Sequence, residues 1–441
     1  MIMQVSVQSP KLPFLSKVIE KVVHAQLSHH LLEHSLLDHF QSAFRPNHRT
    51  ESAHIHVLND ILTETDAGSF VRLLLLDLSA AFDTVDHNIL LTRLESFAGV
   101  TGTALNWFHS YLSDRSFSIH IGDCSSPFVP LPWGVPQGSI LGPLLFSIYI
   151  LPLGNIIAKR GLHYHIYADD CQIYMALNRS SSITQLSECL AEIKTWLASN
   201  IPKFNDNKTE AILFKPKHNL HTSAAFDFSP LNLNSCVTSL GVKLDADLSV
   251  SAHVNATVRS CFFQLSCLTR LKPILKRPHL ESVIHAFITS RLDFSNSVLI
   301  GANVSVLNRL QKVQKAAARF LSNTNRRCHI TPIPVDLHWI PVHFRIQYKV
   351  LTFAYKALNG LAPLYLSELL TPYIPSRSLR SADHLLLKVP KMKYKARGER
   401  AFAFAAPRLW NALPLVVRQA SSLAQFKSSL KPHFFNLAFG Q

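Results

Sequence analysis

The sequence predicts an α/β half followed by a basic, mostly helical half, with a boundary near residue 250. One observation behind this is the apolar run VRLLLLDL at 71–78, whose length and continuity suit a strand buried on both faces. A second is the segment 163–177, which reads as two short strands around a tight turn. The third is the stretch 254–323, which is helical in pattern and rich in Lys and Arg but has few acids.

The other elements follow in chain order from the spacing of apolar side chains. Helical intervals predict helices over 16–39, 87–97, 104–113, 140–151 and 183–197. Alternation predicts strands over 115–122 and 209–215 and a hairpin over 239–250. GVPQGS at 134–139 is expected to be a loop, and from Pro332 onward recurring prolines separate short helices.

Composition bounds the class of protein. A chain of 441 residues is too long for one small core, so two or three domains are expected. Its 47% hydrophobic and 16% charged residues are typical of a folded globular protein. The formal charge of +16 favours a polyanionic partner, with nucleic acid ahead of an anionic membrane.

Cysteine usage and the first residues bear on the compartment. The seven cysteines are scattered without a CxxC pair, so they are expected to be reduced thiols of an intracellular protein, with no zinc knuckle. Residues 1–10 lack the pattern of a secretory signal, which argues against secretion. Nucleus and cytoplasm are not distinguished by these features.

One uncharged stretch, 133–158, is long enough to cross a bilayer. Three prolines and three glycines inside it interrupt any continuous helix: Pro136, Gly138, Gly142, Pro143, Pro152 and Gly154. A buried loop–helix–loop is therefore the expected structure, and no membrane partner is expected.

Three carboxylates carry the candidate chemistry. Asp77 ends an apolar strand, where an ionised group is costly to bury without compensation, and Asp169 and Asp170 are adjacent at a hairpin tip. Together they would suit Mg²⁺, a hard ion that prefers oxygen ligands, and two such ions can assist an in-line phosphoryl transfer. Because Asp77 and Asp169 lie far apart in the sequence, this requires a sheet in which strand 71–78 lies beside the hairpin of 163–177. Each element alone also has an ordinary explanation, since Asp77 could start a turn or cap a helix and Asp169–Asp170 could be a polar turn.

The motifs, taken together, resemble one known family. LLLLDLSAAFDTVDH, GVPQGSILGPLLFSIYI and YADDCQIY look like the three core palm motifs of a non-LTR, LINE-type retrotransposon reverse transcriptase. NKTEAILF and SLGVKLDADLS resemble the two motifs that follow, and FQSAFRPNHRTESA resembles a fingers motif. Downstream, HITPIPVDLHWIPVHFRIQYK, YKALNGLAPLYLSELLTPY and APRLWNALP resemble the C-terminal region of the CR1/L2-like branch, so the likeness runs from about Leu12 to the end.

This resemblance implies the α/β palm of a right-hand polymerase with partial fingers, followed by a mostly helical thumb and a basic C-terminal region. The corresponding ranges are 1–250 for fingers and palm, 251–330 for the thumb and 331–441 for the C-terminal region. Compared with the family pattern, no endonuclease region and no Arg-Pro pair precede the LPFLSK stretch, and Trp133 and Ala43 replace small residues and a glycine common there. The chain is thus expected to be the C-terminal part of an element polyprotein.

Residue roles follow from the motif positions. The resemblance implies that Asp77, Asp169 and Asp170 bind the catalytic metals, two Mg²⁺ ions or possible Mn²⁺ substitutes, with Asp169 the firmer of the adjacent pair. Phe82 matches the bulky gate against a ribose 2′-hydroxyl, and a core aromatic is its alternative. Arg45 matches a cation near the triphosphate, and an ordinary surface arginine is its alternative.

Further positions are carried over in the same way. Gln137 would help to position the incoming nucleotide and template, while Gly138, with Gly134, would let the backbone approach nucleic acid. Lys208 could donate a proton to pyrophosphate or be a solvated lysine. The Leu240–Gly241 hairpin would grip the primer. Asp83 and Asp86 are expected to be turn and helix-cap residues.

Basic residues of the helical half are candidate phosphate contacts or a plain solvated face: Arg259, Arg270, Lys272, Lys276 and Arg277. The implied reaction adds deoxynucleoside triphosphates to a DNA primer on an RNA template, with no obligate protein partner evident. A catalytically inactive remnant that only binds RNA or DNA is the alternative from another class. A membrane-surface protein is a third hypothesis, supported by charge and by the 133–158 stretch alone.

Overall fold

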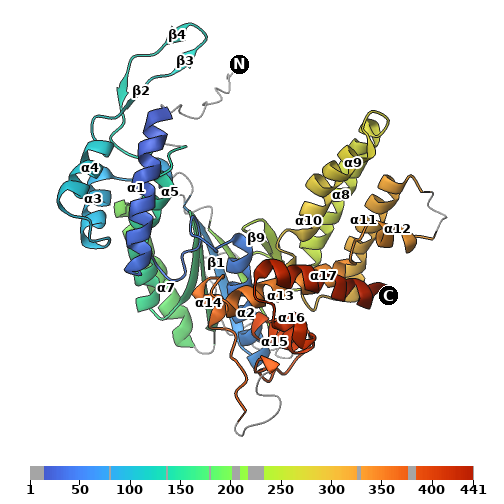
Figure 1. Cartoon of the computed structure of the whole chain (residues 1–441). Coiled ribbons are helices and arrows are strands. Elements are labelled where there is room, and N and C mark those ends of the chain that lie inside the picture. The colour runs from blue at the N-terminus through green and yellow to red at the C-terminus, as the bar shows by residue number, and fades with distance from the viewer. Residues whose placement is uncertain are drawn as a thin grey trace. The chain divides into compact units, whose positions relative to one another are not determined.

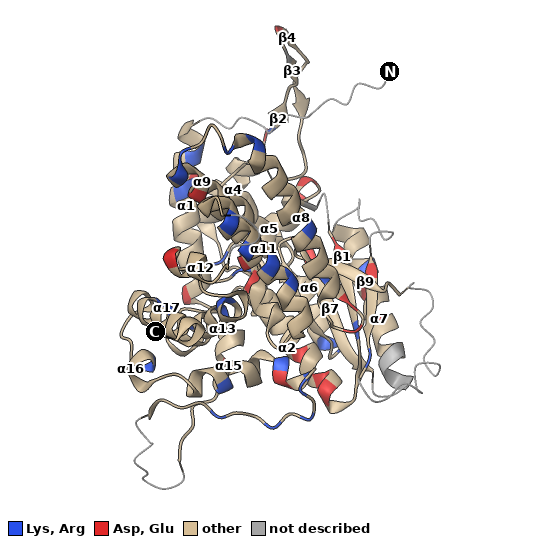
Figure 2. Cartoon of the chain, turned by 90° about the vertical axis from the view of Figure 1, so that its right-hand side faces the viewer, with Lys and Arg blue, Asp and Glu red and all other residues tan. Residues whose placement is uncertain are grey.

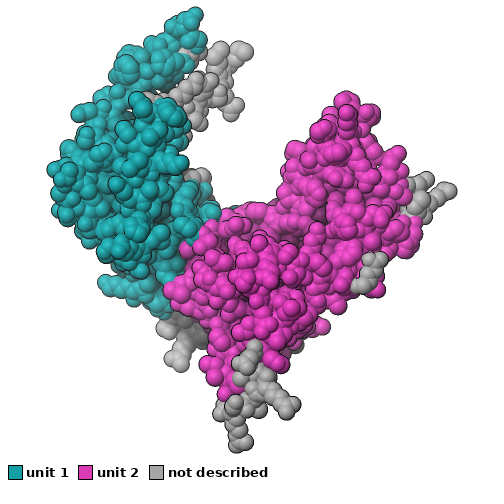
Figure 3. Space-filling model, in the orientation of Figure 1, with its two compact units in different colours: residues 1–46, 73–175, 179–210 teal, residues 47–72, 176–178, 211–441 magenta. Residues whose placement is uncertain are grey.

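The computed structural model describes residues 14–78, 81–135, 138–177, 180–200, 209–216, 233–324, 329–375 and 384–440. The chain divides into two compact units that alternate along the sequence (Figure 3). Unit 1 comprises residues 1–46, 73–175 and 179–210, and unit 2 comprises residues 47–72, 176–178 and 211–441. The boundaries expected near residues 250 and 330 stay predictions.

A four-stranded sheet carries the first candidate carboxylates. Its strand order is β6-β7-β1-β8, with β1 at Phe70–Asp77 (labelled in Figure 1), β6 at His163–Tyr167, β7 at Asp170–Leu177 and β8 at Glu210–Phe214. β6 and β7 form an antiparallel hairpin in which Tyr167 pairs with Asp170. The predicted sheet, with strand 71–78 beside hairpin 163–177, is therefore confirmed.

Helices of unit 1 supply the rest of its core. Their bounds are α1 (Phe14–Glu33), α3 (His87–Ser96), α4 (Gly102–Leu112), α5 (Gly142–Tyr149), α6 (Leu151–Lys159) and α7 (Ser180–Asn200), with a single 3₁₀ turn η1 (Ala81–Asp83). The expected helices over 87–97, 104–113 and 183–197 fall on α3, α4 and α7. Asp86 caps α3 as predicted, because its side chain accepts hydrogen bonds from the Asn88 and Ile89 amides.

The apolar stretch of 133–158 forms α5 and α6, and it is broken at Ile150. Among the described residues, Gly142–Lys159 is one stretch apolar and long enough to cross a membrane, yet most of it is buried inside the protein. Leu144 through Tyr149 are all buried. A core helix pair is thus observed where a buried loop–helix–loop was predicted.

Residues 115–122 differ from the single expected strand. They form two strands of two residues each, β2 (Ser116–Phe117) and β3 (His120–Ile121). β2 pairs with β5 (Val129–Pro130) and β3 pairs with β4 (Cys124–Ser125), so the alternating pattern is split between two small antiparallel pairs. The sequence alternates as predicted, but this alternation does not produce one buried face. Both residues of β2 and of β5 are exposed, so burial does not stabilise a single continuous strand.

Unit 2 contains a two-stranded hairpin and many helices. The hairpin is β9 (Cys236–Ser239) with β10 (Val242–Asp245), three residues earlier than the predicted range begins. The helices are α2 (Thr50–Ala67), α8 (Ser251–Leu271), α9 (Arg277–Ile284), α10 (Ser290–Asp293), α11 (Val304–Ser322), α12 (Pro332–Asp336), α13 (Val342–Leu358), α14 (Leu364–Ser367), α15 (Phe402–Asn411), α16 (Leu415–Arg418) and α17 (Leu423–Phe439). Shorter turns are η4 (His285–Thr289), η5 (Asn296–Leu299) and η7 (Gly398–Arg400).

Helix α2 is the centre of unit 2. Of its 18 residues, thirteen are buried, and several of these are polar. The polar ones are partnered by segments far along the chain: the Asp66 carboxylate accepts the amides of Lys393, Tyr394 and Gly398. Since a buried carboxylate is costly unless it is hydrogen-bonded, these contacts tie the C-terminal region to α2.

Candidate active site

The end of strand β1 and the β6–β7 turn bring the predicted carboxylates together in unit 1. Asp77 is the last residue of β1, and the Leu78 amide that follows it donates to the carbonyl of Asp169 at 3.0 Å. Ala168, just before Asp169, has a φ of +57°, in the left-handed region that a non-glycine residue rarely adopts. The sheet order and this tight turn therefore place all three aspartates at one edge of the sheet.

The Asp170 carboxylate shows the electrostatic consequence of this arrangement. Its side chain keeps access to solvent, but the surrounding protein partly desolvates it. Desolvation, followed by repulsion from Asp169 and Asp77, raises its pKa from 3.8 to about 6. Partial burial and the two neighbouring carboxylates therefore both favour the protonated form of Asp170.

The chemistry of these donors fits a hard divalent cation, because carboxylate oxygens are the ligands that Mg²⁺ prefers. In the described part of the chain, however, no three Asp, Glu, His or Cys side chains stand together in an arrangement that would hold a metal ion as they are. The backbone thus brings Asp77, Asp169 and Asp170 to the same edge of the sheet. Their side chains would have to adjust to form a complete set of metal ligands.

Phe82 and the GVPQGS loop lie against each other beside this edge. The Phe82 carbonyl accepts the Val135 amide at 2.9 Å, and the Gly134 amide donates to Val85 at 2.8 Å. The Phe82 ring stacks on buried Phe146, with centroids 4.2 Å apart, and keeps part of its surface exposed. The two sequence motifs are therefore neighbours in space, and the gate role of Phe82 stays a prediction.

Glycine is required in this loop for steric reasons. Gly134 has a φ of +87°, and a Cβ there would lie 3.0 Å from the Asp83 carbonyl oxygen. Gly138 also has a positive φ, +79°, with open space around it. Gln137 and Lys208 lie outside the described residues, so their roles stay predictions.

Arg45 is held by its own loop. Its guanidinium donates to the carbonyls of Asp38 and Gln41, at 2.5 and 2.9 Å. The same loop is fixed to the edge of β6, since the Ser42 amide donates to Ile166 and the Ile166 amide donates to Phe40. The structure shows what positions Arg45, and its contact with a triphosphate remains a prediction.

Glu20 is a site residue that sequence reasoning missed. It lies on α1, is 1% exposed, and accepts hydrogen bonds from Ser139 Oγ at 3.0 Å and from the Ile140 amide at 2.6 Å. Tyr111 donates to the same carboxylate at 3.1 Å, and burial raises the pKa of Tyr111 to about 12. The available signal was the position of Glu20, an acid within the helix predicted over 16–39. Such a residue could have been predicted to be buried and to hold a neighbouring segment.

Within unit 2, the Leu240–Gly241 turn joins β9 and β10. Ser239 pairs with Val242, and both turn residues have positive φ, +43° and +82°. Two positive φ values in a two-residue loop are typical of a type I′ turn, which matches the twist of a hairpin. The hairpin prediction is confirmed here, and its grip on a primer stays a prediction.

The helices that follow are strongly basic. Residues 251–324 hold ten Lys and Arg and two acids, Glu281 and Asp293. Both acids are engaged, Glu281 with Arg277 at 3.5 Å and Asp293 with Arg345. Lys and Arg positions lie along α11 and at the start of α9 (blue in Figure 2), so this part of unit 2 carries excess positive charge. The proposed phosphate contacts of Arg259, Arg270, Lys272, Lys276 and Arg277 stay predictions.

A sheet edge with three aspartates, beside an apolar helix and a glycine-containing loop, defines the palm of a nucleic-acid polymerase. Residues 10–244, more than half of the chain, match the family model described as reverse transcriptase (RNA-dependent DNA polymerase). The chain therefore belongs to the reverse transcriptase family. The predicted fold class, an α/β palm followed by a helical C-terminal part, is confirmed.

Relatives from mobile elements agree with this assignment. The chain is 27% identical over 345 residues to the probable RNA-directed DNA polymerase from transposon BS of Drosophila melanogaster, covering 76% of this chain and 38% of that protein. It is 25% identical over 345 residues to the RNA-directed DNA polymerase from mobile element jockey of Drosophila funebris, covering 74% and 36%. The LINE-type resemblance is confirmed, and the chain spans less than two fifths of the length of these relatives.

Solved structures with some likeness are telomerases. One is telomerase from Candida albicans in complex with a fragment of telomeric RNA, with 12% identity, a TM-score of 0.40, and coverage of 76% of this chain and 55% of that chain. Another is apo telomerase from Candida tropicalis, with 11% identity, a TM-score of 0.36, and coverage of 68% and 54%.

Proposed function

We propose that this chain is an RNA-directed DNA polymerase of LINE type, which adds deoxynucleotides to the 3′ end of a DNA primer by phosphoryl transfer. The observation that carries the proposal is the contact between the end of β1 and the β6–β7 turn, which gathers Asp77, Asp169 and Asp170. Membership of the reverse transcriptase family supports it. An RNA template, a DNA primer and deoxynucleoside triphosphates would be the substrates.

Divalent cations are general in this family. Two Mg²⁺ ions, or Mn²⁺ in their place, would be held by Asp77, Asp169 and Asp170. When bound, such ions activate the attacking hydroxyl and stabilise the charge on the departing oxygen.

The chain's own residues would orient the substrates. Phe82, held from behind by Phe146, would exclude a ribose 2′-hydroxyl. The loop at Gly134 and Gly138 would let the backbone lie close to the nucleotide, and Glu20 would hold that loop through Ser139. Arg45 would neutralise charge on the triphosphate.

Primer extension on poly(rA) with an oligo(dT) primer tests the proposal. Wild type should extend the primer in Mg²⁺ or Mn²⁺, and Asp169→Ala should lower the rate by at least about 10³-fold, as expected when an electrostatic centre of the reaction is lost. Asp114→Ala, at an exposed acid in the same unit, is the matched control and should keep wild-type activity. Absence of extension by wild type in both metals would contradict the enzyme proposal.

A catalytically inactive nucleic-acid-binding protein is the second candidate. One observation favours it: the excess positive charge of residues 251–324. Under this alternative, wild type and Asp169→Ala would bind an RNA–DNA duplex equally, with affinity that falls steeply with salt, and neither would extend it.

A further inference from the structure

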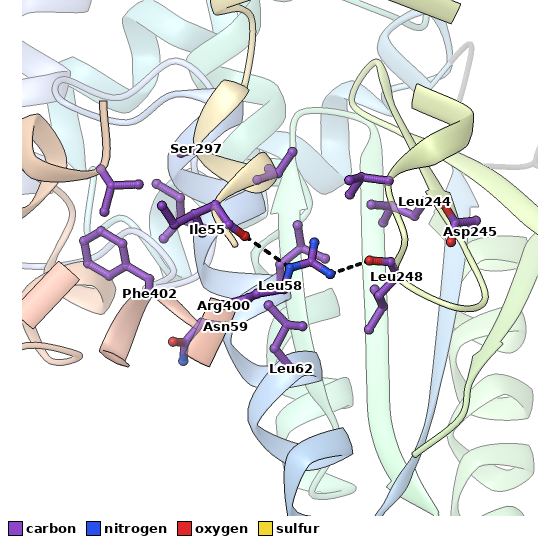
Figure 4. Close-up of a pocket in the computed structure, with 14 residues that line it drawn as sticks. Ile55, Leu58, Asn59, Leu62, Leu244, Asp245, Leu248, Ser297, Arg400 and Phe402 are labelled. Atoms are coloured by element: carbon purple, nitrogen blue, oxygen red, sulfur yellow. Dashed lines mark hydrogen bonds between the residues drawn. The ribbon is translucent and has the colours of Figure 1, made fainter. Parts of the chain in front are cut away.

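A buried arginine of the C-terminal region contacts the connection that follows the β9–β10 hairpin. Arg400 is 7% exposed and belongs to η7. Its Nη1 donates to the carbonyl of Leu248 at 2.5 Å, and its Nε donates to the carbonyl of Ile300 at 3.1 Å (Figure 4). One side chain therefore joins three segments of unit 2 that lie far apart in the sequence.

The first of these segments is backbone that needs external support. Leu248 and Val250, between β10 and α8, have φ values of +54° and +56°. This region is unfavourable for a non-glycine residue, and such conformations persist only where the surroundings determine them. Arg397 adds a second contact to the same connection by donating to the Asp247 carbonyl.

The approach of Arg400 to the second segment depends on a glycine. Gly301 has a φ of +65°, and a Cβ on it would lie 2.6 Å from Cγ of Arg400. The cavity beside the guanidinium is small, about 30 Å³, and its lining is mostly apolar, with Leu58, Leu62 and Leu244 among the residues, but it also includes Asp245 (Figure 4). A guanidinium in such surroundings is stable only while its donors are used, so the two carbonyls are specific partners.

These contacts point to a role in holding primer. We propose that Arg400, supported by Arg397, is a positioning residue that fixes the β9–β10 hairpin relative to α8 and to the segment that leads into α11. This inference rests on the proposed function, in which the Leu240–Gly241 turn grips the primer and the basic helices follow the duplex. The C-terminal region would then act in primer binding through the hairpin, without touching nucleic acid itself.

The contacts by which Arg400 and Arg397 fix the β9–β10 hairpin are called the clamp. Hydrogen–deuterium exchange of the full chain tests the clamp without any catalysis. In Arg400→Met, amides of residues 236–250 should exchange at least tenfold faster than in wild type, and Arg400→Lys should restore part of the protection. Arg408→Met, at an exposed arginine paired with Glu399, is the matched control and should behave as wild type. Arg397→Met, which removes only the Asp247 contact, should give a smaller increase and serves where Arg400→Met does not fold. Unchanged exchange in a folded Arg400 or Arg397 variant would overturn the clamp.

Primer extension then tests the link to function. Arg400→Lys and Arg397→Met should raise the KM for the primer–template at least fivefold and leave both the KM for the deoxynucleotide and kcat within twofold of wild type. A fall in kcat with an unchanged KM for the primer–template would overturn the positioning role. If wild type itself fails to extend, the proposed function fails, while the exchange result still decides whether the clamp exists.

Discussion

At the residue scale, the loop that precedes α5 depends on a single buried acid. Glu20 accepts hydrogen bonds from the Ser139 hydroxyl, the Ile140 amide and the Tyr111 hydroxyl. Ser139 in turn accepts the amides of Leu141 and Gly142, at the start of α5. Ser16, on the same helix, also donates to this carboxylate at 3.4 Å, so four donors of the described residues converge on it.

Glu20→Gln should therefore destabilise unit 1. The amide group of glutamine has one acceptor oxygen, and its NH₂ group would face the hydrogen-bond donors that surround Glu20. The free energy of unfolding should therefore fall by about 2 kcal/mol. The change is measured by urea unfolding, and primer extension should fall with it because the GVPQGS loop loses its anchor. Glu33→Gln, at an exposed acid on the same helix, is the control and should unfold as wild type does. Equal stability of Glu20→Gln and wild type would show that the carboxylate is dispensable.

His54 predicts how stability depends on pH. It is buried on α2, where Nε2 lies 2.9 Å from the Ser239 carbonyl, and burial lowers its pKa from 6.5 to about 4, with His253 acting in the same direction. Between pH 6.5 and 4 the unfolded chain binds a proton that the folded chain does not. Stability should therefore fall as pH drops through this window, by up to about 3 kcal/mol from this residue.

Urea unfolding between pH 4.5 and 7.5 measures this effect. His54→Gln keeps a donor for Ser239 and has no proton to gain, so its unfolding free energy should vary less with pH than that of wild type. His279→Gln, at an exposed histidine of unit 2, should retain the wild-type slope. Identical slopes for His54→Gln and wild type would assign the acid sensitivity to other groups.

At the element scale, local patterns predicted what local forces determine. The buried strand β1, the two hairpins and the amphipathic helix α7 follow from apolar spacing and turn residues that lie within each element. The β1–β7 pairing was inferred from the shared chemistry of Asp77 and Asp169, and that prediction is confirmed at the level of the sheet. The placement of Glu20 was beyond such patterns, because its partners lie at Tyr111 and Ser139–Ile140.

Helix α2 shows why other elements could not be predicted. Its buried side chains include the polar Glu51, His54, Asn59 and Asp66 beside the apolar Ile55, Leu58 and Leu62, so its buried surface is wider than its apolar stripe. Each of these polar groups has a partner from a distant segment: for example, Asn59 accepts the Ala403 amide. Burial of this polar face depends on segments far along the chain, so it has no local signal in the sequence.

Gly398 is the point of closest approach between α2 and η7. A Cβ on Gly398 would lie 2.6 Å from Cγ of Asp66, and its amide donates to that carboxylate. Gly398→Ala should therefore displace Asp66 or η7 and cost about 2–3 kcal/mol, the upper part of the range found for overpacking. Gly360→Ala, with a φ of +67° but nothing within 4 Å of the added Cβ, should cost only about 1 kcal/mol of backbone strain. Equal losses in thermal unfolding would rule out a steric role for Gly398.

At the scale of the whole molecule, unit 2 is assembled from segments that lie far apart in the sequence. Residues 47–72 belong with residues 211–441: α14, α15 and η7 lie near α2, and α13 contacts it through Lys349 and Glu51. The second half of the fingers motif and the C-terminal region lie far apart in the sequence, but both belong to unit 2. The C-terminal region is thus a structural part of unit 2 as well as a carrier of positive charge.

A chain that ends at residue 330 should therefore fail to form unit 2. It would lose Lys349 beside Glu51, the Tyr365 hydroxyl on Ser52 and the amides on Asp66. It would also expose apolar side chains of α2 such as Ile55 and Leu58, which line one cavity together with Val350 and Phe402 of the lost region. A domain's entire stability is about 5–15 kcal/mol, and each large buried side chain contributes about 1.5–3 kcal/mol, so this loss exceeds what remains.

Amide exchange of α2 provides the measurement. Residues 50–67 should be protected in the full chain and should exchange within seconds in the 1–330 chain, and co-expression with residues 331–440 should restore protection. Restoration in trans would separate a missing structural partner from a general loss of solubility. Full protection of α2 in the 1–330 chain alone would instead make the C-terminal region an independent appendage, and the clamp by Arg400 would then have no structural basis.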